Sequence, residues 1–510
     1  MDNQPSFTLL SPPNAHGFSA QDVRYEADVA IVGSGPGGSA AAKVLSEAGL
    51  RVVVLEMGPQ KSRFRTNYAH TARYHMQEGG AMVAQGKAMI PVAAGQGVGG
   101  STLINSALSF RAPKSVLDHW ANILQEESWG FDALTPLYDE ISTFIGVQKT
   151  HEGIAGKNNE LIVRGIKTLG YDGGFAPRST PLCVGCGVCY YGCPSGGKGS
   201  SNRNFLAVAA QKNTIIHAEV RVDQLYVESG KIVGVRGRCV DPDSKAQGGM
   251  VEVFAPRVIL SAGAIGTPRL LWHSKTTDIL GSHVGEGLQI HPGSTLIGIA
   301  DEKIEMWKGA TQGAYYHPPN LEGVLPHTFS APPEACLLAA GFVGSRFQEG
   351  LALLPNMCGM LVMVSDKGKG HVRAKKDGSS DIHYDFHPKD VERIKEGLVS
   401  VSKVLLTGGA KDLRAPIHGI GVINDPEELR KQLKKCSIQD FTLYAAHPMG
   451  TCPMGLNPEN SVIQPNGETH RIQGLYIADA SVFPSSLGVN PQLSTMVVST
   501  RIAQQILETL

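Results

Sequence analysis

The chain of 510 residues lacks a net charge, a long hydrophobic run and a secretory signal pattern. Its 46 basic and 46 acidic residues balance without a long run of either sign, so nothing favours nucleic acid or an anionic membrane surface as a partner. No apolar segment reaches the roughly 18 residues of a transmembrane helix, because Pro355 and Asn356 interrupt the nearest one, 351–364. The polar segment 1–22 lacks a basic-then-apolar pattern, and we expect a cytoplasmic protein.

Cysteine is scarce and glycine is abundant. Nine cysteines, four of them clustered, fit a reducing compartment better than a disulfide framework. Sixty glycines are well above the roughly 7% of average usage, which indicates many turns and close approaches between backbone and ligand. The length suffices for two or three domains with a large core.

The segment 27–56 predicts a dinucleotide site. An apolar strand at 29–32 is followed by a Gly-rich turn, a helix at 39–48 and a second apolar strand at 52–55 that ends in Glu56. The turn carries the G-x-G-x-x-G fingerprint as Gly33, Gly35 and Gly38, in the strand–turn–helix context that gives the motif its meaning. Glu56 follows at roughly the 20 residues expected of an acid that binds a ribose 2′-hydroxyl, so the pattern favours FAD or NAD over NADP.

The segment 183–198 is rich in cysteine and predicts a metal site. Cys183, Cys186, Cys189 and Cys193 follow the C-x2-C-x2-C-x3-C-P spacing of bacterial ferredoxins. Thiolates at these intervals can hold an iron–sulfur cluster or a tetrahedral zinc ion. Because no second run supplies a partner for the fourth cysteine, the first three could hold a three-iron cluster, or all four could hold zinc. The thiols could instead only pack, or pair as disulfides, and so stabilise a loop.

Four ordered motifs resemble the signatures of a known family. The loop 95–105 and the segments 129–138, 263–274 and 474–495 are similar to those of the glucose–methanol–choline (GMC) oxidoreductases, which use FAD. Together with the cysteines, the closing segment looks closest to the long-chain alcohol oxidase branch. Some members attach FAD through a His just before the Asn of the loop; Ile104 stands there, so the resemblance implies non-covalent FAD.

The resemblance also implies an active site near the C-terminus. His447 would take the proton of the substrate hydroxyl, and Asn490 would hydrogen-bond to the same oxygen. Imidazole suits this role because its pKa lies near neutrality. The residues that we expect to contact FAD are Gly33, Gly35, Gly38, Glu56, Gly99, Gly100, Ser101, Asn105, Val222, Ala262, Gly263, Asp479, Ala480, Asn490 and Pro491.

We therefore expect an α/β protein in which a Rossmann-like βαβ FAD-binding domain is interleaved with an α+β substrate domain built on an antiparallel sheet. The predicted FAD-binding domain comprises residues 24–112, 203–295 and 440–510, and the substrate domain comprises residues 113–202 and 296–439. We also expect a strand across residues 351–364 and a helix over residues 389–406.

The expected function is oxidation of a small-molecule alcohol to an aldehyde or ketone by hydride transfer to FAD, with electrons passing to an external acceptor or to oxygen. Two alternatives use the same fold. A lyase of the hydroxynitrile lyase type would keep FAD and His447 without net redox chemistry, and an electron-transfer or assembly protein would bind FAD without turnover.

Overall fold

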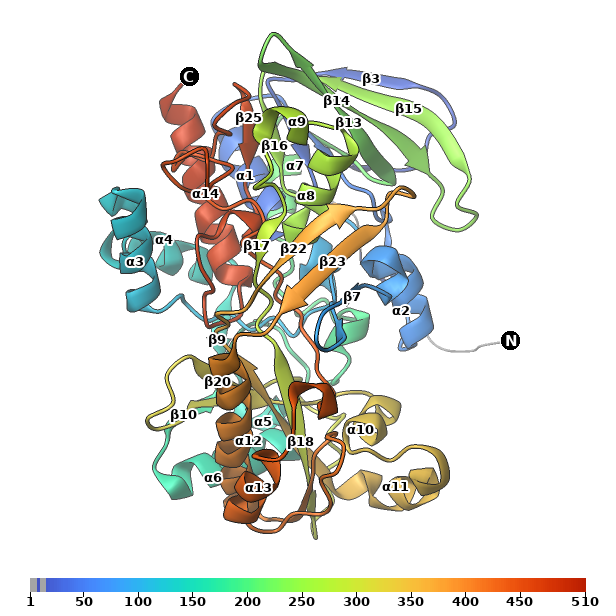
Figure 1. The fold of residues 1–510 in the computed structure, drawn as a ribbon. Coiled ribbons are helices and arrows are strands. Elements are labelled where there is room, and N and C mark those ends of the chain that lie inside the picture. The colour runs from blue at the N-terminus through green and yellow to red at the C-terminus, as the bar shows by residue number, and fades with distance from the viewer. Residues whose placement is uncertain (1–6, 10–14) are drawn as a thin grey trace.

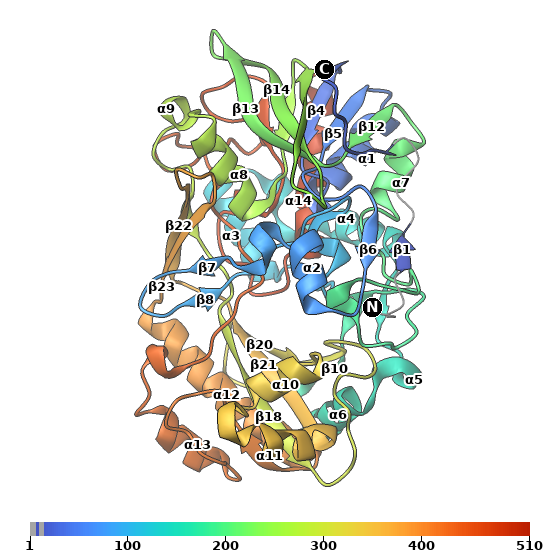
Figure 2. The same cartoon turned by 90° about the vertical axis from the view of Figure 1, so that its right-hand side faces the viewer.

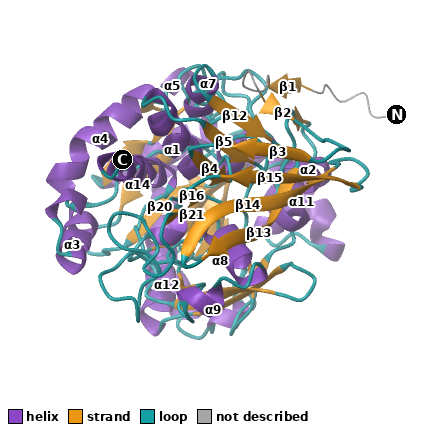
Figure 3. Ribbon diagram, turned by 90° about the horizontal axis from the view of Figure 1, so that it is seen from above, coloured by secondary structure: helices purple, strands orange, loops and turns teal. Residues whose placement is uncertain are grey.

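The computed structural model describes residues 7–9 and 15–510. Two six-stranded sheets lie at opposite ends of the molecule, and the chain passes between them several times (Figure 1). Seen from above, the strands run across the centre and the right of the molecule, and most helices lie at its left (Figure 3). Among the described residues, no helix combines the length and the apolar character needed to cross a membrane.

The first sheet is parallel and is assembled from distant parts of the chain. Its central strands are short, fully buried and rich in Val and Ile, as expected of strands covered on both faces. Helix α1 (Pro36–Glu47) connects β4 to β5 and packs against the last helix, α14 (Gln492–Glu508). The strand order is β2 (Ala15–His16), β12 (Thr214–His217), β5 (Val52–Leu55), β4 (Val29–Val32), β16 (Val258–Leu260) and β25 (Leu475–Ile477).

A four-stranded sheet adjoins the parallel sheet at the upper end of the molecule (Figure 1). Its central hairpin turns at Ser229 and Gly230, where both residues have positive φ. Helix α8 (Gly263–His273) follows strand β16 and places residues 262 and 263 beside the carboxyl end of the sheet. The strand order is β13 (Val220–Glu228), β14 (Lys231–Val240), β15 (Gln247–Phe254) and β3 (Val23–Glu26).

The second six-stranded sheet is antiparallel and lies at the lower end in Figures 1 and 2. The long helix α12 (Pro388–Gly408) and helix α6 (Lys157–Leu169) pack on one of its faces. The sheet's other face is turned toward the parallel-sheet part of the molecule. The strand order is β10 (Asp172–Phe175), β19 (Ala314–His317), β20 (Val324–Thr328), β21 (Met357–Val364), β18 (Gly293–Ala300) and β24 (Ala410–Arg414).

The structure confirms the expected fold class and corrects one element. The α/β dinucleotide fold and the antiparallel sheet are both present, whereas the exact domain limits stay a prediction. The expected strand over 351–364 is wrong in its first half. Residues Phe347–Leu353 form helix α11, a turn at Leu354–Asn356 ends it, and the strand begins at Met357. Pro355 explains the break, because proline cannot donate a backbone hydrogen bond to a continuing helix.

Candidate active site

The three fingerprint glycines serve different purposes. A Cβ on Gly33 would lie 2.3 Å from the carbonyl oxygen of Ser261, and one on Gly38 would lie 2.0 Å from the carbonyl oxygen of Gly33. Gly35 differs, because a Cβ there would meet nothing nearer than the Cα of Gly100 at 4.0 Å. The protein itself therefore requires Gly33 and Gly38, whereas Gly35 leaves open space beside the cavity.

The N-terminus of helix α1 suits a phosphate group. Its N-cap, Gly35, provides no side-chain cap for the first N–H groups, and residues 33–37 line the cavity except for Ser34. Unpaired N–H groups and the positive end of the helix dipole favour an anion at such a position. Arg221 lines the same cavity and adds positive charge, whereas the charge of Arg269 is paired with Glu78 at 2.8 Å. These features fit the diphosphate of FAD.

Glu56 is buried and holds three loops together. Its Oε2 accepts hydrogen bonds from the backbone N–H and the hydroxyl of Ser34 at 3.0 and 2.7 Å. Its Oε1 accepts from the N–H groups of Gly58 at 2.8 Å and Gly97 at 3.1 Å. A carboxylate offers about four acceptor positions, so these four hydrogen bonds within the protein already occupy them. Glu56 lines the cavity, and its contact with a ribose stays a prediction.

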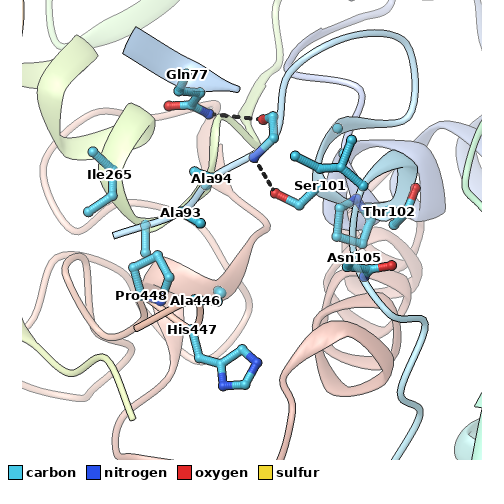
Figure 4. Close-up of a pocket in the computed structure, with 18 of the residues that line it drawn as sticks. Gln77, Ala93, Ala94, Ser101, Thr102, Asn105, Ile265, Ala446, His447 and Pro448 are labelled. Atoms are coloured by element: carbon cyan, nitrogen blue, oxygen red, sulfur yellow. Dashed lines mark hydrogen bonds between the residues drawn. The ribbon is translucent and has the colours of Figure 1, made fainter. Parts of the chain in front are cut away.

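The second Gly-rich loop lies against the fingerprint turn. A Cβ on Gly100 would lie 2.6 Å from the Cα of Gly35, and the N–H of Gly99 donates to the hydroxyl of Ser34 at 3.1 Å. Ser101 Oγ accepts a hydrogen bond from the N–H of Gly95 at 2.8 Å, and Asn105 donates to the side chain of Gln492. Figure 4 shows Ser101, Thr102 and Asn105 on this loop, across the cavity from His447.

Asp479 lies at the end of β25 and is buried. Its carboxylate accepts hydrogen bonds from the N–H of Gly263 at 2.9 Å, from the hydroxyl of Thr267 at 2.6 Å and from the N–H of Ser481 at 2.7 Å. Burial raises the pKa of this carboxyl group despite these donors. The carboxylate therefore joins the start of helix α8 to the C-terminal segment.

His447 and Asn490 meet in the cavity. Nε2 of His447 lies 3.0 Å from Nδ2 of Asn490, and Nδ1 of His447 lies 3.3 Å from Nδ1 of His291. Burial, followed by the neighbouring imidazoles of His291 and His327, holds the pKa of His447 well below its usual value. Burial likewise lowers the pKa of His291, to about 3. Both rings are therefore neutral near pH 7.

The hydrogen-bond donors determine the resting tautomers of this pair. The N–H of Gly488 donates to Nε2 of His291 at 3.0 Å, so neutral His291 carries its proton on Nδ1. That proton points at Nδ1 of His447, which places the proton of His447 on Nε2. The amide oxygen of Asn490 has no partner among the described residues, and turning the amide over lets this oxygen accept from Nε2–H.

One cavity of about 510 Å³ connects the fingerprint to His447. Its charged lining residues all come from the parallel-sheet part of the molecule: Glu56, Arg221, Arg269 and Asp479. Of the residues predicted to contact FAD, Gly38 and Gly99 do not line the cavity. The others line the cavity: Gly33, Gly35, Glu56, Gly100, Ser101, Asn105, Val222, Ala262, Gly263, Asp479, Ala480, Asn490 and Pro491.

Sequence reasoning missed several cavity residues. His291, Gln312, His327 and Tyr190 line the cavity, and none was expected there. His291 and Gln312 share a signal that only the structure reveals: both hold a positive φ (52° and 43°), a strained conformation for residues other than glycine. Strain of this kind concentrates at functional sites.

The four clustered cysteines line one small cavity beside the active site. Cys183, Cys186, Cys189 and Cys193 share its wall with Lys198, and all are free thiols. In the part of the chain that the structure describes, no three His, Cys, Asp or Glu side chains gather as they would around a metal ion. The predicted zinc site is therefore not supported, because Zn–S bonds of about 2.3 Å require closely gathered sulfurs. The predicted iron–sulfur site is not supported either, for the same reason.

Two buried cations connect this cavity to the loop at 103–106. Nζ of Lys198 donates to the carbonyl oxygens of Leu103, Asn105 and Cys189 at 2.9, 2.6 and 3.1 Å. Arg178 donates to the carbonyl oxygen of Ser106 at 2.9 Å and contacts the sulfur of Cys189 at 3.3 Å. Burial alone would raise the pKa of the Cys189 thiol, but these two cations outweigh it and lower the pKa.

Comparison with known proteins agrees with this architecture. The family described as GMC oxidoreductase matches residues 72–293 with its N-terminal part and residues 366–499 with its C-terminal part. The family described as FAD binding domain matches residues 26–76. An uncharacterised GMC-type oxidoreductase of Mycobacterium tuberculosis is 32% identical over 485 residues, which cover 94% of this chain and 75% of that protein.

Relatives with named activities are more distant. A long-chain-alcohol oxidase of Arabidopsis thaliana is 28% identical, covering 98% of this chain and 71% of the relative. An oxygen-dependent choline dehydrogenase of Cronobacter sakazakii is 26% identical, covering 94% of this chain and 95% of the relative. Among solved structures, formate oxidase of Aspergillus oryzae superposes with a TM-score of 0.72 at 18% identity, covering 96% of this chain and 99% of that one. With the dinucleotide site and the His447–Asn490 pair in one cavity, this chain belongs to the GMC oxidoreductase family and contains an FAD-binding domain.

Proposed function

We propose that this protein oxidises the CH–OH group of an alcohol to an aldehyde or ketone, with non-covalently bound FAD as the hydride acceptor. The supporting observation is that His447 and Asn490 meet at 3.0 Å in the cavity that begins at the dinucleotide fingerprint. The electrons leave afterwards to an external acceptor or to oxygen. The alcohol oxidases and the choline dehydrogenase among the relatives are consistent with this reaction class.

His447 is the proton acceptor in this proposal. Removing a hydride from a carbinol carbon leaves alkoxide character on the oxygen, and the hydroxyl proton needs a base within hydrogen-bond reach. Because its pKa is lowered, His447 is neutral near pH 7 and has an unprotonated ring nitrogen. The amide of Asn490 can donate a hydrogen bond to the same oxygen without competing for the proton. FAD, when bound, supplies the two-electron acceptor.

The resting tautomer adds a step to this chemistry. His447 can accept a proton on Nε2 only after its own proton has moved to Nδ1, where it faces His291. His291 must then carry its proton on Nε2 and give up the hydrogen bond from Gly488. Losing a buried hydrogen bond of this kind costs about 1–3 kcal/mol. The proposal therefore includes a tautomer exchange before the hydroxyl proton is transferred. The Nε2 proton of His447 leaves to water in the cavity, the Nδ1 proton of His291 passes to Nδ1 of His447, and water returns a proton to Nε2 of His291.

The test is flavin reduction by alcohol under anaerobic conditions in the wild type and in His447→Ala. We expect the variant to keep bound FAD and to reduce it at least about 100-fold more slowly, the usual size of a general-base contribution. His418→Ala, on a loop remote from the cavity lining, is the matched control. Reduction of His447→Ala at the wild-type rate would reject the assignment. Wild-type flavin that no alcohol bleaches would instead favour the lyase or non-catalytic alternatives.

We also propose that the four clustered cysteines hold an iron–sulfur cluster, which would draw their sulfurs closer together than they lie in this structure. The support is that all four free thiols line a single cavity and that Lys198 and Arg178, both buried, take only carbonyl, hydroxyl and sulfur groups as hydrogen-bond partners among the described residues. Buried cations are costly without anionic partners, and thiolates or an anionic cluster would supply them. A cluster here would lie one residue from Tyr190, which lines the flavin cavity.

Iron, sulfide and zinc assays of the purified protein test this second proposal. Cys186→Ser should lose iron and sulfide while keeping FAD, and Cys436→Ser, whose thiol lies outside the cavity, should keep all three. Wild-type protein that contains neither iron nor sulfide after anaerobic purification and anaerobic reconstitution with both would exclude the cluster.

A further inference from the structure

The antiparallel sheet forms the substrate-side wall of the main cavity, and its strand register determines which side chains face inward. In the antiparallel pair of β20 and β21, His327 lies opposite Leu361, and Leu325 lies opposite Met363. Residues two apart on a strand share a face, so these four side chains project together. Leu325, Leu361 and Met363 join the core beneath the flavin domain, whereas Val324, Met360 and Val362 join the core around helix α12.

This wall carries no full charge. The residues that line it come from the sheet and from neighbouring loops, and none of them is Asp, Glu, Lys or Arg in the part of the chain that the structure describes. A carboxylate or a quaternary ammonium placed there would lose its hydration without gaining an ionic partner. The wall consists mainly of Tyr190, Gln312, His327, Phe329, Leu361 and Met363.

Polar side chains of this cavity, including His327 and Tyr444, have a buried atom without a hydrogen-bond partner among the described residues, and His327 is the one on the sheet wall. Its side chain is only 1% exposed, and its Nε2 has no hydrogen-bond partner among the described residues. Its Nδ1 lies 3.3 Å from Nε2 of Gln312, so the ring is held in place from the other side. Buried polar atoms are nearly always paired in folded proteins, and an unpaired one on a cavity wall is available to a water or to a ligand atom.

His327 also lines the same cavity as His447. It is one of the two imidazoles that lower the pKa of His447, and burial lowers its own pKa to about 4. A neutral ring can donate or accept one hydrogen bond at Nε2, depending on how the amide of Gln312 is turned. A neutral oxygen, in a hydroxyl or a carbonyl group, is therefore a suitable partner.

We propose that the substrate is an uncharged alcohol with an apolar body and a second oxygen, and that this second oxygen hydrogen-bonds to Nε2 of His327. The apolar body would pack on Leu361, Met363 and Phe329 while the reacting hydroxyl meets His447 and Asn490. This inference rests on the proposed alcohol oxidation and adds the substrate class. It makes His327 a specificity residue, with Gln312 as the group that positions it.

The test compares substrate pairs that differ only in the second oxygen, such as an alkan-1-ol and the alkanediol of equal chain length. Hydroxy acids and choline serve as charged comparisons. With the wild type we expect kcat/KM to favour the diol by about 10- to 100-fold at the best chain length, the range expected when a buried polar group is left unpaired. We expect His327→Phe to reduce this ratio to near one and His327→Gln to restore part of it. His317→Phe, an exposed histidine on the neighbouring strand β19, should leave the ratio unchanged.

Two results would overturn the proposal: a wild-type preference for plain or charged alcohols, or an unchanged diol preference in His327→Phe. Should no alcohol reduce the flavin, the proposed oxidation fails first. The same pairs can then be compared by the change in flavin absorbance when they bind, which reports recognition without turnover. A diol preference in binding that His327→Phe removes would support the His327 assignment in that case, and its absence would contradict it.

Discussion

Two alanine substitutions in the same glycine fingerprint should have opposite consequences. Gly38→Ala places a Cβ 2.0 Å from the carbonyl oxygen of Gly33, so strand β4 and helix α1 must separate by more than 1 Å to relieve the overlap. Gly35→Ala meets nothing nearer than 4.0 Å, and Gly35 has a φ of −66° that alanine adopts without strain. Only a ligand in the cavity would contact the new methyl group.

The expected magnitudes follow from these distances. Overpacking of the kind caused by Gly38→Ala costs about 1–3 kcal/mol or more in stability. Gly35→Ala should raise the free energy of unfolding of the FAD-free protein slightly, by less than about 1 kcal/mol. If the diphosphate approaches Gly35, the same crowding weakens FAD binding by about 10- to 100-fold. Urea unfolding of the FAD-free proteins and FAD titration followed by fluorescence measure the two quantities.

Wild-type affinity for FAD in Gly35→Ala would show that the diphosphate does not approach Gly35. Unfolding of Gly38→Ala at the wild-type urea concentration would show that strand β4 and helix α1 do not need their close contact. Gly421→Ala is the control, because the new Cβ would meet open space and Gly421 has no positive φ. Gly49→Ala would not serve, since the φ of 89° at Gly49 strains any side chain.

Two further predictions concern titration and buried charge. The pKa of His447 is lowered well below its usual value, so the rate of flavin reduction should be constant above about pH 6.5. The rate should fall only at lower pH, where His447 becomes protonated. A rate that still rises between pH 7 and pH 9 would contradict His447 as the base. Glu56→Gln replaces one acceptor oxygen by an amide donor and loses two of the four hydrogen bonds. This change should lower the free energy of unfolding by about 3 kcal/mol or more. An unchanged urea midpoint would show that the three loops do not depend on this carboxylate.

The local part of the site could be predicted from the sequence, because its signals are contiguous. The strand, turn and helix around Gly33, Gly35 and Gly38 depend on neighbouring residues, and the cavity forms where these motifs predict it. Glu56 shows the limit of such reasoning. Its position was anticipated, but its four donors come from three separate loops, and no spacing rule reveals them.

The substrate side could not be predicted, because strand register determines it. His327 faces the cavity since it lies opposite Leu361 in the antiparallel pair, and a shift of one residue would turn it toward helix α12. His291 comes just before strand β18 and lies beside His447, although more than 150 residues separate the two in sequence. The cysteine spacing predicted a metal site; the structure places all four cysteines around one cavity, and the metal stays a prediction.

The anaerobic absorbance spectrum of the purified protein, before and after addition of uncharged alcohols, is the decisive measurement for FAD-dependent alcohol oxidation. We expect the yellow absorbance of bound FAD and its bleaching by at least one alcohol of the panel. A colourless protein that stays colourless when FAD is added, or flavin bands that no alcohol diminishes, would contradict this expectation.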